Sequence, residues 1–77
     1  MNRDEKRLIR DAIKEASNLR DSAIQSKRYY ERLEFIQHNV HSKPLDDVQA
    51  DAYMNAHLDI ARYASIIAEL KERLRGR

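Results

Sequence analysis

Three histidines are the residues of this chain best suited to bind a metal or to transfer protons. His38 and His41 lie three residues apart, a spacing that would place two imidazoles on one face of a helix. A metal site needs further ligands, and these would have to come from Asp46 or Asp47. The HExxH pattern is absent. We therefore interpret His38 and His41 as polar residues at a helix end, interpret His57 as a hydrogen-bonding residue beside a helix contact, and predict no metal and no cofactor.

The serines and carboxylates do not form a recognisable catalytic pattern. None of the five serines lies in the glycine-flanked turn that exposes a nucleophile, and a chain with one glycine has no Gly-rich phosphate loop. Carboxylates such as Glu31 and Glu69 have Arg28 and Arg73 three or four residues away, which is the spacing of ion pairs on a helix surface. We predict no catalytic residue, no enzyme activity and no small-molecule substrate.

The adjacent Tyr29 and Tyr30 are flanked by basic residues in the segment from Lys27 to Arg32. Such a segment can stack on exposed nucleic-acid bases. Both tyrosines also fit helix packing, with Tyr30 in a helix contact and Tyr29 at its edge. We favour packing as the interpretation.

Length and composition predict a single domain, residues 1–77. A core of this size is marginal, and without cysteine no disulfide can brace it. No apolar run approaches the roughly 20 residues that span a bilayer, and the first residues lack the apolar centre of a secretion signal. We expect a cytoplasmic protein without membrane contact.

The elements that carry these residues are two long helices. The first is predicted over residues 3–40, begun by Asn2 with Glu5 three residues later in the manner of a capping box. Its contact positions alternate in steps of three and four, as in a heptad seam. They are Ile9, Ala12, Ala16, Leu19, Ala23, Ser26, Tyr30, Leu33, Gln37 and Val40.

Pro44, the only proline, predicts a turn over residues 41–43 and a second helix over 44–75, with Ser42 or Lys43 as the N-cap. Gly76, the only glycine, suits the left-handed position after that helix. The second seam has the same alternating steps. It consists of Gln49, Tyr53, Ala56, Ile60, Tyr63, Ile67, Leu70 and Leu74.

The two seams match when the chain is folded back near residue 42, so that facing positions sum to about 83. Small residues of the first helix then face large ones of the second, as Ala16 faces Ile67 and Ala23 faces Ile60. Tyr30 would face Tyr53. The sequence thus predicts an all-α fold, an antiparallel two-helix hairpin.

Apolar residues outside the seams predict association with other chains. They include Leu8, Phe35, Val48, Met54 and Leu58, which surround much of each helix. We expect two hairpins to form a homodimeric four-helix bundle, with a different protein partner, a trimer or another assembly as alternatives.

Charge is unevenly distributed along the predicted hairpin. Residues 1–14 and 69–77 carry nine basic and five acidic side chains, a net charge of +4, whereas the rest carries six basic and eight acidic ones, a net charge of −2. The open end, where the chain ends meet, is therefore basic. Its arginines are the nucleic-acid-binding candidates: Arg3, Arg7, Arg10, Arg73 and Arg75.

Three functional hypotheses follow. The first is a non-enzymatic protein–protein interaction module, such as a small regulator, inhibitor, adaptor or co-chaperone, and by analogy with many small helical proteins we favour a bacterial or phage origin. The second is an RNA- or DNA-binding regulator, since in length and architecture the chain resembles plasmid-encoded helical-hairpin RNA-binding regulators. The third is a structural or assembly protein. The predicted protein-contact residues are Tyr29, Phe35, Ile36, Met54, Leu58 and Ala61.

Overall fold

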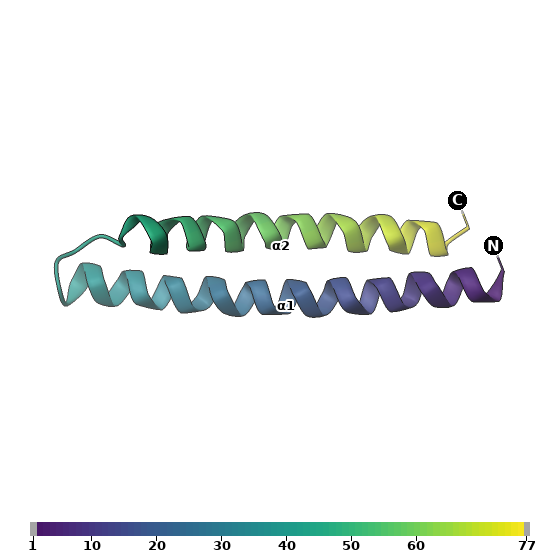
Figure 1. Ribbon diagram of the computed structural model, residues 1–77, viewed down its shortest axis with the longest axis horizontal. Coiled ribbons are helices and arrows are strands. Elements are labelled where there is room, and N and C mark those ends of the chain that lie inside the picture. Colours follow the sequence, from purple (N-terminus) through teal and green to yellow (C-terminus); the bar gives the residue numbers. More distant parts are fainter. Residues whose placement is uncertain (1, 77) are drawn as a thin grey trace.

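The computed structural model describes residues 2–76 and consists of two α-helices. Helix α1 spans Arg3–Asn39 and helix α2 spans Asp47–Leu74. They run antiparallel beside each other, so that both chain ends lie at one end of a rod measuring 57 × 16 × 15 Å (Figure 1). The predicted all-α hairpin is confirmed.

The N-terminus of α1 is capped by the predicted residue. The Asn2 Oδ1 accepts a hydrogen bond from the Glu5 backbone N–H at 2.8 Å, and the Asn2 side-chain amide donates to Glu5 Oε1 at 3.2 Å. The acid therefore bonds to the amide side chain of the cap, whereas a standard capping box uses the backbone N–H of the cap. In both arrangements the side chain of the cap accepts a hydrogen bond from the backbone N–H three residues later.

The turn is longer than predicted, and α2 begins three residues later. Residues 40–46 form the connection, in which Ser42 has a φ of +53° and the Lys43 N–H donates to the Gln37 carbonyl at 2.9 Å. Asp46, rather than Ser42 or Lys43, is the N-cap. Its carboxylate accepts from the Gln49 N–H at 2.7 Å, and the Gln49 side chain accepts from the Asp46 N–H at 3.1 Å. This complete capping box satisfies two backbone donors, which Ser42 in its left-handed conformation does not.

The end of α2 follows the prediction. Gly76 has a φ of +84°, and its N–H donates to the Arg73 carbonyl at 3.1 Å. A residue without a Cβ adopts this backbone conformation at little cost, so the helix stops here.

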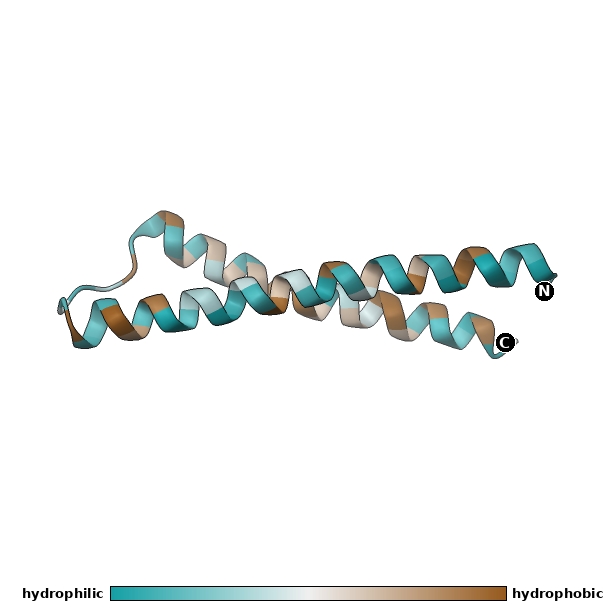
Figure 2. Cartoon of the chain, turned by 90° about the horizontal axis from the view of Figure 1, so that it is seen from below, coloured by the Kyte–Doolittle hydropathy of each residue, from teal (hydrophilic) through white to brown (hydrophobic). Residues whose placement is uncertain are grey.

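The core is a narrow line of small and large side chains between the helices. The buried residues are Ala16 and Ala23 from α1 with Ala56 and Ile67 from α2. The alanines allow the helices to approach closely, and the isoleucine fills the space that they leave. Seen at right angles to the first view, the helices cross near their middle (Figure 2).

The predicted register nearly holds. Tyr30 and Ala52 line one hollow of the contact, together with Ala23 and Asp59, and each of these pairs sums to 82. Tyr30 does not stack on Tyr53, however. Tyr30 packs edge-on against Tyr29, with ring centroids 5.1 Å apart, and Tyr53 lies against His57 at 4.8 Å, so both ring contacts are with neighbours on the same helix.

The predicted seam is correct for α2, whereas on the first helix four of its ten positions are exposed, one of them Val40. Every predicted position of α2 is buried or half-buried. On α1, Ala12, Leu19 and Ser26 are exposed, and their successors at the next position are half-buried instead: Ile13, Arg20 and Lys27. The contact face of α1 is thus rotated by about 50° from the predicted one, half of the 100° that separates successive residues in a helix.

Candidate interaction surfaces

The rotation of α1 leaves a second heptad-spaced stripe beside its contact with α2, about 100° around the helix from that contact. We call it the outer stripe. Its large members other than the half-buried Leu33 are exposed, from 40% for Ile36 to 67% for Val40. Its apolar members recur in the positions that a helix partner would contact. They are Leu8, Ala12, Leu19, Tyr29, Leu33, Ile36 and Val40.

The outer stripe was only partly recognised in the sequence. Tyr29 and Ile36 were predicted contacts, but Ala12, Leu19 and Val40 had been assigned to the contact with α2. The available signal was a second alternation of steps of three and four, which shares Ala12, Leu19 and Val40 among other positions with the first and replaces the rest by the preceding residue, as Leu8 replaces Ile9.

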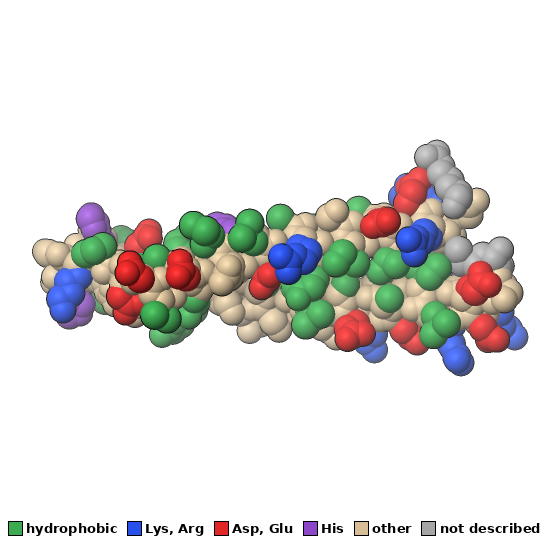
Figure 3. Space-filling view, turned by 45° about the horizontal axis from the view of Figure 1, so that its top comes forward, with side chains coloured by type: hydrophobic (Ala, Val, Ile, Leu, Met, Phe, Trp, Pro, Cys, Tyr) green, Lys and Arg blue, Asp and Glu red, His purple; other side chains and the backbone are tan. Residues whose placement is uncertain are grey.

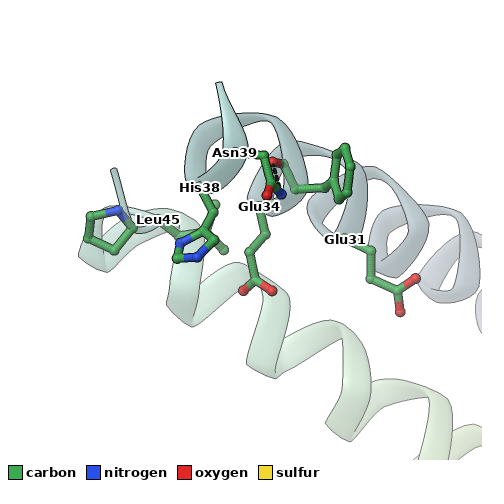
Figure 4. Close-up of a pocket in the computed structure, with 7 residues that line it drawn as sticks. Glu31, Glu34, His38, Asn39 and Leu45 are labelled. Carbon is green, nitrogen blue, oxygen red and sulfur yellow. Dashed lines mark hydrogen bonds between the residues drawn. The ribbon is translucent and has the colours of Figure 1, made fainter. Parts of the chain in front are cut away.

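A second surface lies at the turn end of the hairpin, where two adjoining hollows share Glu34, Pro44 and Leu45. We call this surface the turn groove. One hollow, of about 450 Å³, is lined further by Glu31, Phe35, His38 and Asn39 (Figure 4). The other, of about 430 Å³, is lined further by Ala50, Tyr53, Met54 and His57.

The turn groove combines apolar walls with carboxylates. Phe35 and Met54 are both more than 60% exposed. Burial raises the pKa of the Tyr53 hydroxyl, and the negative charges of Glu31 and Glu34 and a hydrogen bond with Glu31 raise it further. Tyr53 therefore stays protonated at neutral pH and links α2 to α1 beside the groove.

The outer stripe and the turn groove lie on nearly opposite sides of α1. Glu34 and His38 of the groove each precede by two residues a member of the stripe, Ile36 and Val40 respectively. Two residues correspond to about 200° around a helix. A partner on one surface therefore leaves the other accessible.

The six predicted protein-contact residues therefore do not lie together on a single surface. Tyr29 and Ile36 belong to the outer stripe, and Phe35 and Met54 line the turn groove. Leu58 and Ala61 are exposed on α2, on the side away from its contact residues. On one face of the molecule, hydrophobic side chains gather toward the turn and again in the half that holds the chain ends (Figure 3).

The candidate arginines at the open end fall into two groups. Arg73 pairs with Glu69 at 3.7 Å, as the sequence predicted, and Arg75 pairs with Glu72 at 3.3 Å. Arg3, Arg7 and Arg10 are exposed on one face of α1, and they make no ion pair within residues 2–76. A carboxylate partner reduces the charge that an arginine offers to a phosphate, so the α1 group is the stronger candidate.

The other three ion pairs among residues 2–76 are also local to one helix, the first being Arg20 with Asp21 at 3.6 Å. Lys27 pairs with Glu31 at 3.5 Å, which replaces the predicted pair of Arg28 with Glu31, and Arg62 pairs with Asp59 at 3.8 Å. Exposed pairs of this kind stabilise a fold by less than about 1 kcal/mol. They support the helices individually rather than the contact between them.

The three histidines do not all come together. His38 and His57 line the turn groove from α1 and α2, where the exposed His57 lies beside Tyr53, while His41 lies in the connection. Within residues 2–76 no group of three or more His, Asp or Glu side chains is placed to hold a metal ion. In the same part of the chain, neither helix is long and apolar enough to cross a membrane.

Comparison of the chain with known protein families, with curated proteins and with solved structures finds no match.

Proposed function

We propose that this protein is a non-enzymatic protein-interaction module that works as a homodimeric four-helix bundle. In this form it serves as a small regulator, adaptor or inhibitor whose activity is binding. The outer stripe takes up a second copy, and the turn groove and the exposed side of α2 remain accessible to another protein.

The observation that carries the proposal is the surplus of accessible surface. The hairpin exposes 6213 Å². A compact monomer of 9.1 kDa exposes about 4,900 Å². The difference is about 1,300 Å² for each chain, or about 2,600 Å² for two, which lies in the range of permanent homodimer interfaces.

The composition of the outer stripe supports the same conclusion. Leu8, Leu19, Tyr29, Ile36 and Val40 are all large and at least 40% exposed. Soluble monomers rarely expose so many large apolar residues along one helix face, because their burial is favourable by about 25 cal/mol per Å². Among residues 2–76 of the single hairpin four are buried, so the second copy would supply most of the core.

Sedimentation equilibrium tests the proposal with two matched variants. Leu19→Glu places a charge in the outer stripe, and Leu58→Glu places the same charge on the exposed side of α2. Leu19 and Leu58 are both exposed in the single chain, so neither change disturbs the hairpin itself. We expect the wild type and Leu58→Glu to sediment as dimers and Leu19→Glu as a monomer. A monomeric wild type would overturn the proposal, and open-ended assemblies would favour a structural role.

Nucleic-acid binding is a second candidate, favoured by the three unpaired arginines on one face at the open end. Phosphate contacts release counterions, so the affinity for a short RNA or DNA duplex would fall steeply between 50 and 200 mM salt. Fluorescence anisotropy with wild type and Arg7→Gln measures this. Loss of one phosphate contact lowers the salt slope by about 1. An affinity independent of salt would exclude this candidate.

A further inference from the structure

The two ends of the hairpin carry opposite net charges. At the open end, residues 2–14 and 69–76 hold eight basic and five acidic side chains, a net charge of +3. At the turn end, residues 28–57 hold three basic and five acidic side chains, a net charge of −2. The middle, residues 15–27 and 58–68, holds three of each and is neutral.

We propose that the second copy docks on the outer stripe in the antiparallel orientation, with the turn end of each hairpin beside the open end of the other. This inference rests on the proposed function. In a parallel dimer the two basic ends would lie within about 10 Å, the distance over which charges interact at 0.1 M salt. The antiparallel dimer replaces that repulsion by attraction at both ends, and it also opposes the dipoles of the two α1 helices.

The outer stripe has a matching register for this orientation. In this register a residue of one copy faces the residue of the other copy for which the two numbers sum to 48. Such a register exists because the alternating steps of three and four residues are the same in both chain directions. Large residues then meet large or small ones across the interface: Leu8 with Val40, Ala12 with Ile36, and Leu19 with Tyr29 of the second copy. Ser22 and Ser26 meet at the two-fold axis, where short side chains let the helices approach closely.

Glu15 also distinguishes the two orientations. It is exposed at the one charged position within the apolar part of the outer stripe, and it makes no ion pair within residues 2–76. A parallel dimer would place Glu15 against its own counterpart, and two facing carboxylates repel. In the antiparallel register Glu15 lies opposite Leu33 and one residue from Arg32 of the second copy. Arg32 is exposed and likewise forms no ion pair in the described part of its own chain.

Spin labels at single cysteines test the orientation directly, since the chain has no cysteine of its own. Val40→Cys places the label near the turn end, and Gln25→Cys places it beside the two-fold axis as a matched control. Both positions are exposed. The antiparallel register separates the two copies of residue 40 by about 48 Å along the helix axis, at 1.5 Å per residue, and those of residue 25 by about 3 Å.

Pulsed electron–electron double resonance measures the distance between the two labels of a dimer, and each orientation predicts different distances. The proposal predicts a long distance of about 50 Å for Val40→Cys and a short one, under about 20 Å, for Gln25→Cys. Short distances at both positions would overturn the antiparallel orientation but leave the dimer intact. Absence of coupling at both positions, with monomers in sedimentation, would overturn the dimer and the orientation together.

Salt dependence provides an independent readout. In the antiparallel dimer, screening removes attraction between unlike ends, so the dimer Kd rises with NaCl concentration. A Kd that falls with salt would indicate that like-charged ends lie together and would overturn the orientation.

Discussion

Replacing Ile67 by alanine tests the helix contact on which both proposed surfaces depend. Ile67 is 4% exposed, and the Ala16 that is expected to face it is 6% exposed. The change removes three carbons from a buried side chain between the two helices. Substitutions of this kind cost about 2–5 kcal/mol. We expect a loss in the lower half of that range, about 2–3.5 kcal/mol, because the narrow core of a hairpin relaxes more readily than a deep one.

Ile66→Ala is the matched control, since it makes the same chemical change one residue away. Ile66 is 39% exposed, so its truncation loses less buried area and leaves no enclosed cavity. We expect a cost of about 1 kcal/mol. For a domain of this size 1 kcal/mol lowers Tm by about 4–8 °C. The expected Tm losses are therefore about 10–25 °C for Ile67→Ala and about 4–8 °C for Ile66→Ala.

Circular dichroism at 222 nm during heating measures both variants. All samples must have the same protein concentration, because the stability of a dimer depends on it. Equal Tm losses for the two variants would refute the register of α2 described here. A larger loss for Ile66→Ala would mean that the opposite side of the helix holds the core.

Three further outcomes are expected. Arg20→Met should stabilise the fold by about 1 kcal/mol in urea unfolding, because the Arg20 Nε is buried without a hydrogen-bond partner and the exposed pair of its Nη2 with Asp21 contributes little; a loss of stability would show that the arginine is needed there. Asp46→Ala should cost about 1 kcal/mol by removing the capping box with Gln49, whereas Ser42→Ala should cost far less if Ser42 is not the cap. The raised pKa of Tyr53 means that its stabilising contribution is present below about pH 10 and is lost as the pH rises through the folded-state pKa. The urea midpoint should therefore fall above pH 10 in the wild type and fall less in Tyr53→Phe; identical profiles would contradict the link to α1.

The separation of the two surfaces has a consequence for regulation. A ligand bound in the turn groove would contact α1 through Glu31, Phe35 and His38, on the side opposite the outer stripe. Its binding would therefore be sterically independent of the proposed dimerisation. Variants of Phe35 or Met54 should leave sedimentation unchanged, while variants of Leu19 should leave the groove intact.

Much of the fold could be predicted because helix formation depends on local chemistry. The caps at Asn2 and Gly76 act through hydrogen bonds to their own neighbours, so residue type and spacing identify them. The contact positions of α2 could also be predicted from the sequence. Almost all of them are apolar, whereas the positions beside them in the middle of the helix, such as His57 and Asp59, are polar. The first residue of α2 was harder to predict, since Ser42, Pro44 and Asp46 would each be compatible with a helix that starts at a different residue.

The face that α1 turns toward α2 was decided by tertiary structure. Apolar or small residues occupy two overlapping stripes of α1, one through Ala12 and Leu19 and one through Ile13 and Ile9, so periodicity alone permits either contact. The choice depends on how α2 crosses α1 and on which side chains then fit beside Ala16 and Ala23, and this is information about two helices together. For that reason the sequence determined the two helices and their antiparallel return, while only the packed hairpin showed which apolar stripe remains for a second chain.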